Sequence, residues 1–492
     1  MTERAKILWV YLLTALFLVV NFYFVIQKDV YWFFLLPIAL IILVYYLISL
    51  DKILLFITFL TPFAVELRGM EGGLGVSLPT EPLMFGVLLL FVANLLLEQK
   101  YNRKVSTHPI SYIIYTMLFW MFFTSLTSEL PLVSFKYLLS RLWFIIPFYF
   151  VAVVMFKKIS NIKKFLALYM AALCIVVIYT IIQHAKYGFA EDAGHWVMSP
   201  FYNDHTAYGA VIAMFIPVAA GFIFFPGATK NVRFFATISL VILITGIILS
   251  YGRAAWISVF VALAVLIAVV LRIKFYVLAV SFAIIIGTFF TFQNQIFDKL
   301  SKNKQDSSGN LVEHVQSISN ITSDASNLER INRWQAAIRL TNERPVFGWG
   351  PGTYQFVYSP FQSSQEKTII STNLGDKGNA HSEYLGPLSE MGFLGMLLVI
   401  VLIIVVIITG LRVYKLGDKK VKFLSLMSLL GLITYFAHGF LNNFLDTDKL
   451  SVPFWGFIAI IVALETYHLP LGNKSEDKAD ESDSSLEANS DS

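Results

Sequence analysis

Residues 389–411 read SEMGFLGMLLVIVLIIVVIITGL, and this stretch decides the fold. A helix needs roughly 20 apolar residues to cross the hydrocarbon core of a bilayer, and this segment supplies them. Similar stretches recur along the chain, so that 57% of the 492 residues are apolar and only 14% are charged. Average soluble domains carry about 25% charged residues. The composition therefore excludes a cytosolic enzyme, a secreted disulfide scaffold and a disordered regulator.

The apolar segments predict an all-α polytopic membrane protein with twelve to fourteen transmembrane helices. The third segment is short, and either re-enters the membrane or is fused with the second. The single cysteine, Cys174, excludes an internal disulfide and a cysteine-based zinc site. The expected spans lie near 7–26, 31–50, 53–66, 81–98, 109–126, 136–156, 164–183, 207–225, 235–250, 254–271, 275–293, 389–411, 422–440 and 452–467.

The distribution of lysine and arginine predicts the orientation. With the N-terminus inside, the short inner segments carry nineteen of these residues and the short outer loops carry five. Both termini are therefore expected in the cytoplasm. Arg4 and Lys6 precede an apolar run that no small-residue cleavage site follows, which predicts a retained signal anchor. Residues 468–492 are acidic and nearly devoid of apolar side chains, so they are predicted to form a disordered cytoplasmic tail.

A hydrophilic segment from residue 294 to about 381 interrupts the spans on the predicted outer side. Its first part, Lys299–Ser326, is rich in Ser, Asn, Asp and Lys and is expected to be mobile. The chain is thus divided into transmembrane helices over 1–293, a large outer loop over 294–388, further transmembrane helices over 389–467 and the tail over 468–492.

The second part of this loop is predicted to be folded. Ser326-Asn-Leu-Glu329 matches a capping box and predicts a helix through about Asn342, which Pro345 stops. The segment Gly348-Trp-Gly-Pro-Gly352 follows as a tight turn. The expected apolar stripe of the helix consists of Leu328, Ile331, Trp334 and Ile338.

Several charged or titratable residues are predicted near the outer ends of spans, where they mark function more often than elsewhere. An arginine there also serves as an anchor that reaches for the interface, and a lone histidine often only packs, so both interpretations stay open. The residues are Arg141, Arg253, His438, Asp446, Asp448, Asp204 and His205.

Three blocks of sequence resemble the O-antigen ligase and polymerase family of bacterial envelope glycosyltransferases. The first is Leu249-Ser-Tyr-Gly-Arg-Ala-Ala-Trp256. The second joins Glu329-Arg-Ile-Asn-Arg-Trp334 to Pro345-Val-Phe-Gly-Trp-Gly-Pro-Gly352. The third runs from Asn379-Ala-His381 through Glu390-Met-Gly392 to Gly395. Ser382 departs from the family, which often has Asn there, and this departure puts a supporting hydrogen bond in doubt.

The resemblance implies a glycosyltransferase of the bacterial inner membrane whose active site faces the periplasm. It would move a glycan from an undecaprenyl-diphosphate carrier to an acceptor hydroxyl, and the cleaved diphosphate linkage would supply the energy without ATP, cofactor or metal. The implied acceptor is lipid A–core or a carrier-linked glycan, and no nucleic acid is involved. The motifs do not separate an O-antigen ligase from a polymerase or a protein O-oligosaccharyltransferase. A non-catalytic polysaccharide or lipid exporter is the alternative from another class.

The residue types suit this chemistry. Arginine binds phosphate bidentately, so Arg253 and Arg330 are the candidate donor-binding residues, with Arg333 and Arg141 ranked second. A histidine can take the proton of an acceptor hydroxyl, which makes His381 the candidate catalytic base. Glu390 either orients the site or caps polar neighbours.

Overall fold

The computed structural model describes residues 15–17, 19, 20, 23, 49–67, 76–97, 102–273, 325–364, 367, 371 and 378–469. Met1–Phe56 and Ile57–Ser492 form two compact units. The first unit is described only at a few helical residues and at the start of α3 (Leu50–Leu60), and the second contains the remaining elements. The predicted spans near 7–26 and 275–293, most of the span near 31–50, nearly all of the predicted mobile segment and the acidic tail lie outside the described residues.

Ten helices in the described part of the chain are long and apolar enough to cross a membrane, which confirms the all-α polytopic fold class. Each coincides with a predicted span to within a few residues. One of them joins α7, the π-helical turn η3 and α8, where Pro147 lacks the amide that a regular helix needs. The ten are α4 (Thr80–Leu97), α6 (Pro109–Leu126), α7–η3–α8 (Pro131–Ile145, Ile146–Val151 and Ala152–Met155), α9 (Ile159–Ala185), α11 (His205–Ile223), α12 (Lys230–Leu249), α13 (Arg253–Val270), α18 (Leu385–Leu416), α19 (Lys419–His438) and α20 (Asp448–His468).

The segment predicted near 53–66, for which a re-entrant course was left open, does not form a helix long enough to span a membrane. Helix α3 ends at Leu60, and the chain continues through a 3₁₀ turn, η2 (Thr61–Phe63), into strand β1 (Val65–Leu67). This strand pairs antiparallel with β2 (Val76–Leu78). Pro62 explains the break, because a residue without an N–H cannot continue the helical hydrogen-bond ladder.

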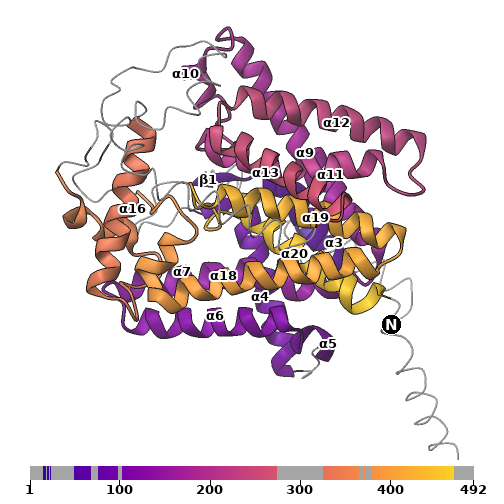
Figure 1. The fold of residues 1–492 in the computed structure, drawn as a ribbon. Helices are drawn as coiled ribbons and strands as arrows, with labels where there is room; N and C mark the ends of the chain where they lie inside the picture. Colours follow the sequence, from indigo (N-terminus) through magenta and orange to yellow (C-terminus); the bar gives the residue numbers. More distant parts are fainter. Residues whose placement is uncertain are drawn as a thin grey trace, which may run out of the picture. The chain divides into compact units, whose positions relative to one another are not determined.

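Helices α11, α19 and α20 form the centre of the second unit, and most of their residues are buried. Helix α19 packs against both α11 and α13, and α18 packs against α6, α19 and α20 (Figure 1). Two of these helices begin at side-chain caps that the sequence supplies. Asp204 accepts a hydrogen bond from the Thr206 amide at the start of α11, and Asp418 accepts one from Val421 at the start of α19.

The described part of the large loop consists of α16 (Ala325–Glu343), α17 (Tyr354–Val357) and a 3₁₀ turn, η4 (Ser359–Phe361). Helix α16 packs against α18, beside the end at which α18 begins (Figure 1). It ends one residue after the predicted Asn342, but it begins at Ala325, so Ser326 lies within it and not at its cap position. Shorter elements elsewhere are α5 (Arg103–Ser106) and α10 (Glu191–Gly194).

The predicted apolar stripe of α16 is wrong. Leu328 and Ile338 are exposed by 36% and 40%. The buried face instead carries small and polar residues together with Leu340, and it packs against the Tyr354 and Tyr358 rings. The polar members are stabilised by hydrogen bonds to one another, and apolar periodicity does not reveal such a face. The buried residues are Glu329, Asn332, Arg333, Ala336, Ala337, Leu340 and Thr341.

Candidate functional site

Arg253 is placed by a tight connection between α12 and α13. Ser250 Oγ accepts a hydrogen bond from the Gly252 amide at 3.3 Å, which turns the chain so that α13 begins at Arg253. Gly209 of α11 allows α13 to approach, because a Cβ at this glycine would lie 3.0 Å from the Ala255 Cβ. The small residues that follow Arg253 therefore bring its helix end against α11.

Arg330 reaches the same region from α16. Its Nε donates a hydrogen bond of 3.2 Å to the Leu441 carbonyl, in the loop between α19 and α20. Burial and the positive charge of Arg253 lower the pKa of Arg330, while Asp204 acts in the opposite direction. The guanidinium of Arg253 thus lies close enough to disfavour the charge of Arg330, although the two residues are 77 positions apart in the sequence. A bound anion would relieve this repulsion.

His381 lies on a short segment, residues 378–384, that leads into α18. Its backbone is in the left-handed region, with φ of 48°, and two contacts hold it there. Asn379 Oδ1 accepts a hydrogen bond from the His381 amide at 3.1 Å, and the Trp334 indole donates to the His381 carbonyl at 3.3 Å. Burial and the charges of Arg330 and Arg333 lower the pKa of His381 to about 4. The imidazole is therefore neutral at pH 7 and able to accept a proton.

Arg333 lies next to this group but is already engaged. Its Nε donates a hydrogen bond to Glu329 Oε1 at 2.6 Å, and its guanidinium carbon lies 4.0 Å from the centre of the Tyr358 ring. A Cβ at Gly378 would collide with the guanidinium, at 1.5 Å from Nη1. Arg333 is held by its neighbours, and its charge acts on His381 from a fixed position.

The α19–α20 loop, residues 439–447, connects the parts of the site. It accepts the Arg330 hydrogen bond at Leu441 and a 3.3 Å hydrogen bond from the Asn379 side chain at Asn443. Its Phe444 and Leu445 amides donate to Glu383 Oε1, at 2.8 and 3.0 Å. The Tyr435 hydroxyl donates to the same oxygen at 2.5 Å. One loop thus fixes both the arginine helix and the histidine segment.

The sequence analysis missed Glu383. The signal was available, because Glu383 is a second ionisable residue within two positions of His381, directly before the apolar segment that forms α18. His195 was also missed: its ring stacks on that of His205 with centroids 4.4 Å apart. Asp204, which acts electrostatically on Arg330 and on His381, and its neighbour His205 belong to the same group. His438 is buried in α19 and bonded to Asn442, and the charges of Arg330 and Asp204 act on it as well.

Arg141 and Glu390 lie within electrostatic range of each other, but they form hydrogen bonds to different segments of the chain. Arg141 is buried in α7, donates hydrogen bonds to the Tyr137 hydroxyl and the Leu445 carbonyl, and lies near the negative charges of Asp446 and Glu383. Glu390 Oε1 accepts a hydrogen bond from the Tyr354 amide at 3.1 Å.

Glu390 also binds the glycine-rich turn through its backbone, because its carbonyl accepts a 2.8 Å hydrogen bond from Gly350. Gly348 has φ of 65°, and a Cβ there would meet the Glu390 backbone at 2.3 Å. The contacts of Glu390 therefore lie in the packing of this turn on α18. Ser382, the residue that departs from the family, bonds through its Oγ to the Tyr384 and Leu385 amides and so begins α18.

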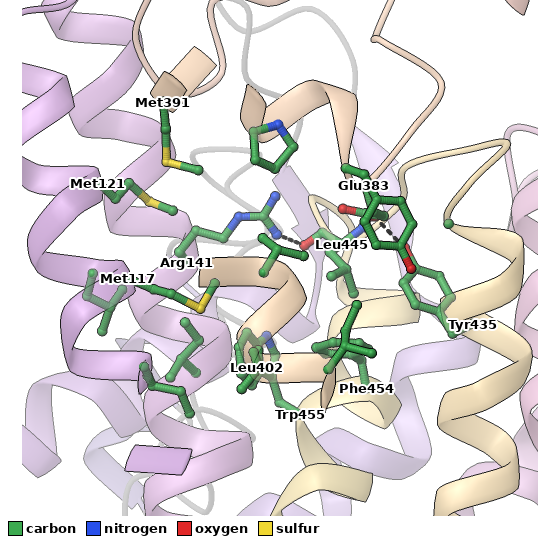
Figure 2. Close-up of a pocket in the computed structure, with 18 of the residues that line it drawn as sticks. Met117, Met121, Arg141, Glu383, Met391, Leu402, Tyr435, Leu445, Phe454 and Trp455 are labelled. Carbon is green, nitrogen blue, oxygen red and sulfur yellow. Dashed lines mark hydrogen bonds between the residues drawn. The ribbon is translucent and has the colours of Figure 1, made fainter. Parts of the chain in front are cut away.

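A cavity of about 90 Å³ lies beside Arg141, between α6, α7, α18, α19 and α20. Figure 2 shows Arg141, Glu383, Tyr435 and Leu445 gathered near one end of it, and Met117, Leu402 and Trp455 on its walls. We call it the Arg141 cavity. In the part of the chain that the structure describes, no group of three or more His, Cys, Asp or Glu side chains could hold a metal ion.

The family model of the O-antigen ligase domain matches residues 238–400. About one third of the chain is thus similar to an O-antigen ligase domain. This confirms the resemblance drawn from the sequence, and the matched segment contains Arg253, Arg330, Arg333, His381 and Glu390, whereas Arg141 lies outside it. Proteins of this family are glycosyltransferase-like enzymes that act on polysaccharides. No curated protein sequence matches the chain.

Proposed function

We propose that this protein transfers a glycan from an undecaprenyl-diphosphate carrier to an acceptor hydroxyl on the periplasmic face of the bacterial inner membrane. The observation that supports the proposal is that Arg330 lies within electrostatic range of both Arg253 and His381, which come from two other segments of the chain. A diphosphate is an anion that suits two arginines, because each guanidinium can bind phosphate oxygens bidentately.

In this mechanism the acceptor oxygen attacks the anomeric carbon of the donor sugar. The bond between that carbon and the diphosphate oxygen breaks, and the acceptor proton passes to the His381 imidazole. Arg253 and Arg330 stabilise the negative charge that develops on the leaving diphosphate. The energy comes from the broken linkage, so the reaction as written consumes no ATP and assigns no step to a metal.

The charges around His381 also couple the base to the donor. Arg330 and Arg333 lower the pKa of His381 in the free protein. A bound diphosphate would offset these positive charges, so the pKa of His381 would rise and the imidazole would become a stronger base when the donor is present. His381 would thereby accept the proton of the acceptor hydroxyl more readily when the donor is bound than it accepts a proton from solvent in the free protein.

The decisive test uses purified protein, carrier-linked glycan and acceptor. Product formation is expected with the natural protein and is expected to be lost in His381→Ala, by roughly 10²–10⁴-fold for a general base. The matched control is His468→Ala at the far end of α20, whose ring contacts the Phe156 carbonyl and should leave transfer intact. Equal product from His381→Ala would end the general-base role, and intact glycan flux in cells carrying it would favour the exporter.

The acceptor separates three versions of this function. A ligase mutant should accumulate long carrier-linked polymer, and a polymerase mutant should carry single repeats on the final acceptor. Loss of glycoprotein staining would indicate a protein O-oligosaccharyltransferase. Gene deletion followed by analysis of these three products tells them apart.

A further inference from the structure

A second cavity, of about 600 Å³ and thus larger than the Arg141 cavity, lies at the end of the bundle opposite to Arg253. Helix α12 connects the two ends, because Thr229 and Val232 at its start line the cavity and its last residue, Leu249, shortly precedes Arg253. Its 20 residues span roughly 30 Å, which is the thickness of the hydrocarbon core of a bilayer. The cavity is thus a membrane's thickness away from the candidate active site, on the side where the distribution of lysine and arginine predicts the cytoplasm.

The lining of this cavity combines apolar side chains with positive charge. Met170 of α9, Phe222 at the end of α11 and Phe235 of α12 contribute apolar surface. Among the described residues that line it, three are lysines and none is Asp or Glu. One of these lysines has its Nζ 5.8 Å from the centre of the Phe225 ring, so its charge lies over the apolar wall. We call it the lysine cavity, after Lys163, Lys164 and Lys420.

Helix ends add to the positive potential here. Three of the described helices begin at the lysine cavity, where α9 contributes Ser160, α12 its cap Thr229 and α19 Lys420. The N-terminus of a helix carries a partial positive charge, which acidic residues in the first turn normally compensate. None of these three helices has an acidic residue in its first turn. Lysines at helix N-termini are unfavourable by themselves, and a bound anion would compensate both.

Two features at this end reduce the positive potential without cancelling it. Helix α11 ends at Ile223, so its terminal carbonyls bring a partial negative charge. Asp418 precedes Lys419 and Lys420, and its carboxylate accepts a 2.8 Å hydrogen bond from the Val421 amide as the cap of α19. One carboxylate that already caps a helix, set against the three lysines that line the cavity, leaves an excess of positive charge.

We propose that the lysine cavity binds an anionic phospholipid. Its phosphate lies between Lys163, Lys164 and Lys420, and the first part of an acyl chain contacts Phe222 and Phe225. The apolar lining favours a lipid over a soluble phosphate, and basic pockets between transmembrane helices suit anionic head groups. The bound lipid joins α9, the α11–α12 turn and α19, and it stabilises the folded protein because it binds only the folded state. This inference does not depend on the proposed function, since the lipid takes no part in the transfer reaction.

The test uses the full chain in detergent, with phosphatidylglycerol and phosphatidylcholine of identical acyl chains as probes. Native mass spectrometry measures the lipid that the protein retains, and thermal unfolding measures its effect on stability. Phosphatidylglycerol should be retained and should raise the thermal midpoint, whereas phosphatidylcholine should do neither. Lys163→Gln combined with Lys420→Gln should weaken the apparent affinity for phosphatidylglycerol by roughly 10- to 100-fold.

Two further variants make this result specific. The matched control is Lys104→Gln combined with Lys415→Gln, which removes the same charge from exposed lysines before α6 and near the end of α18, outside the cavity. It should retain phosphatidylglycerol as the natural protein does. Ala167→Trp fills the cavity at an exposed position of α9 without changing the charge, and it should also lose the lipid. This second variant guards against a folding defect in the lysine variant.

Several outcomes would overturn the proposal. Equal retention of the two phospholipids, or equal loss in both lysine variants, would mean that only the net charge of the protein matters. Displacement of the lipid by soluble glycerol phosphate would assign the cavity to a free anion, and preferential retention of undecaprenyl phosphate would assign it to the carrier. Retention that begins only when residues 473–492 are removed would assign it to the acidic segment of the chain itself.

Discussion

Two groups of arginines in this protein differ in how their charge is balanced. Arg141 is buried among carboxylates and polar groups of its own chain, and its hydrogen bonds join α7 to the α19–α20 loop. The positive charge of Arg253 acts unfavourably on Arg330, while Asp204 acts favourably on Arg330 and Glu191 acts favourably on Arg253. We propose that Arg141 stabilises the folded state, whereas Arg253 and Arg330 bind an anionic substrate. The predictions below test this distinction.

The largest effect is expected when both Arg253 and Arg330, the cationic pair, are replaced. Hydrogen bonds to charged groups contribute about 1.5–3 kcal/mol each, so Arg253→Ala combined with Arg330→Ala should lower kcat/KM for the donor by roughly 10²–10⁴-fold. The measurement is the rate of undecaprenyl diphosphate release against donor concentration. Arg330→Lys should restore only part of the loss, because an ammonium group cannot bind phosphate bidentately. A double variant with natural donor kinetics would contradict the phosphate-binding role.

Arg141 should behave in the opposite way. Removing one partner from a buried group of charges leaves the others uncompensated, and this costs roughly 3–5 kcal/mol of unfolding free energy. Arg141→Met should therefore lower the thermal midpoint in detergent while leaving the donor KM of the folded fraction close to natural. A raised donor KM with unchanged stability would place Arg141 in the donor site and would remove the distinction between the two groups.

The membrane helices could be predicted because the bilayer imposes a simple requirement on sequence. A long apolar segment must form a helix in lipid. The helix at 389–411 could therefore be predicted without knowing which helices pack against it. The predictions failed where a local feature outweighed the apolar pattern of the segment. Pro62 broke a segment that was apolar enough, and α16 buried a polar face held by its own hydrogen bonds.

The candidate site was predictable to the extent that it consists of motif residues. Arg253, Arg330 and His381 each stand in a block that resembles the family, and their roles remain predictions. The α19–α20 loop was not predictable, because it contributes mainly backbone groups at Leu441, Asn443, Phe444 and Leu445, whose chemistry no sequence pattern records. Glu383 could have been noticed as an unusual charge, but its three partners depend on the fold.

Replacing Glu383 should have a smaller effect. Glu383 is one of the carboxylates that oppose the charge of Arg141, and it is two residues from His381. Glu383→Gln keeps an acceptor oxygen but loses the charge, and charge-assisted hydrogen bonds are about twice as strong as neutral ones. We expect a loss of about 1–2 kcal/mol in unfolding free energy and a fall in kcat with little change in donor KM. Donor titrations at fixed acceptor separate these quantities. Glu383→Asp is the conservative control, and a change confined to donor KM would contradict the positioning role.

The smallest effect near neutral pH is expected from titration of His381. Burial and the charges of Arg330 and Arg333 lower its pKa to about 4, so the imidazole stays neutral from pH 7 down to roughly pH 5 and kcat/KM should be nearly constant there. Activity should be lost only as the pH falls through about 4, because the protonated ring cannot accept the acceptor proton. Since a bound diphosphate raises the pKa, kcat should begin to fall at a higher pH than kcat/KM.

The same pH profile separates the two groups of arginines. Removing the positive charge of Arg330 makes protonation of His381 easier, so in Arg330→Ala the acid limb of kcat/KM should move to higher pH. Arg141→Met should leave this limb in place, because Arg141 is not among the charges that act on His381, which are those of Arg330, Arg333, Asp204 and Glu329. An acid limb near pH 6.5 in the natural protein, unmoved by Arg330→Ala, would mean that the imidazole does not feel the arginines. Arg330 would then affect His381 no more than Arg141 does, and the proposed mechanism requires that it affect His381 more.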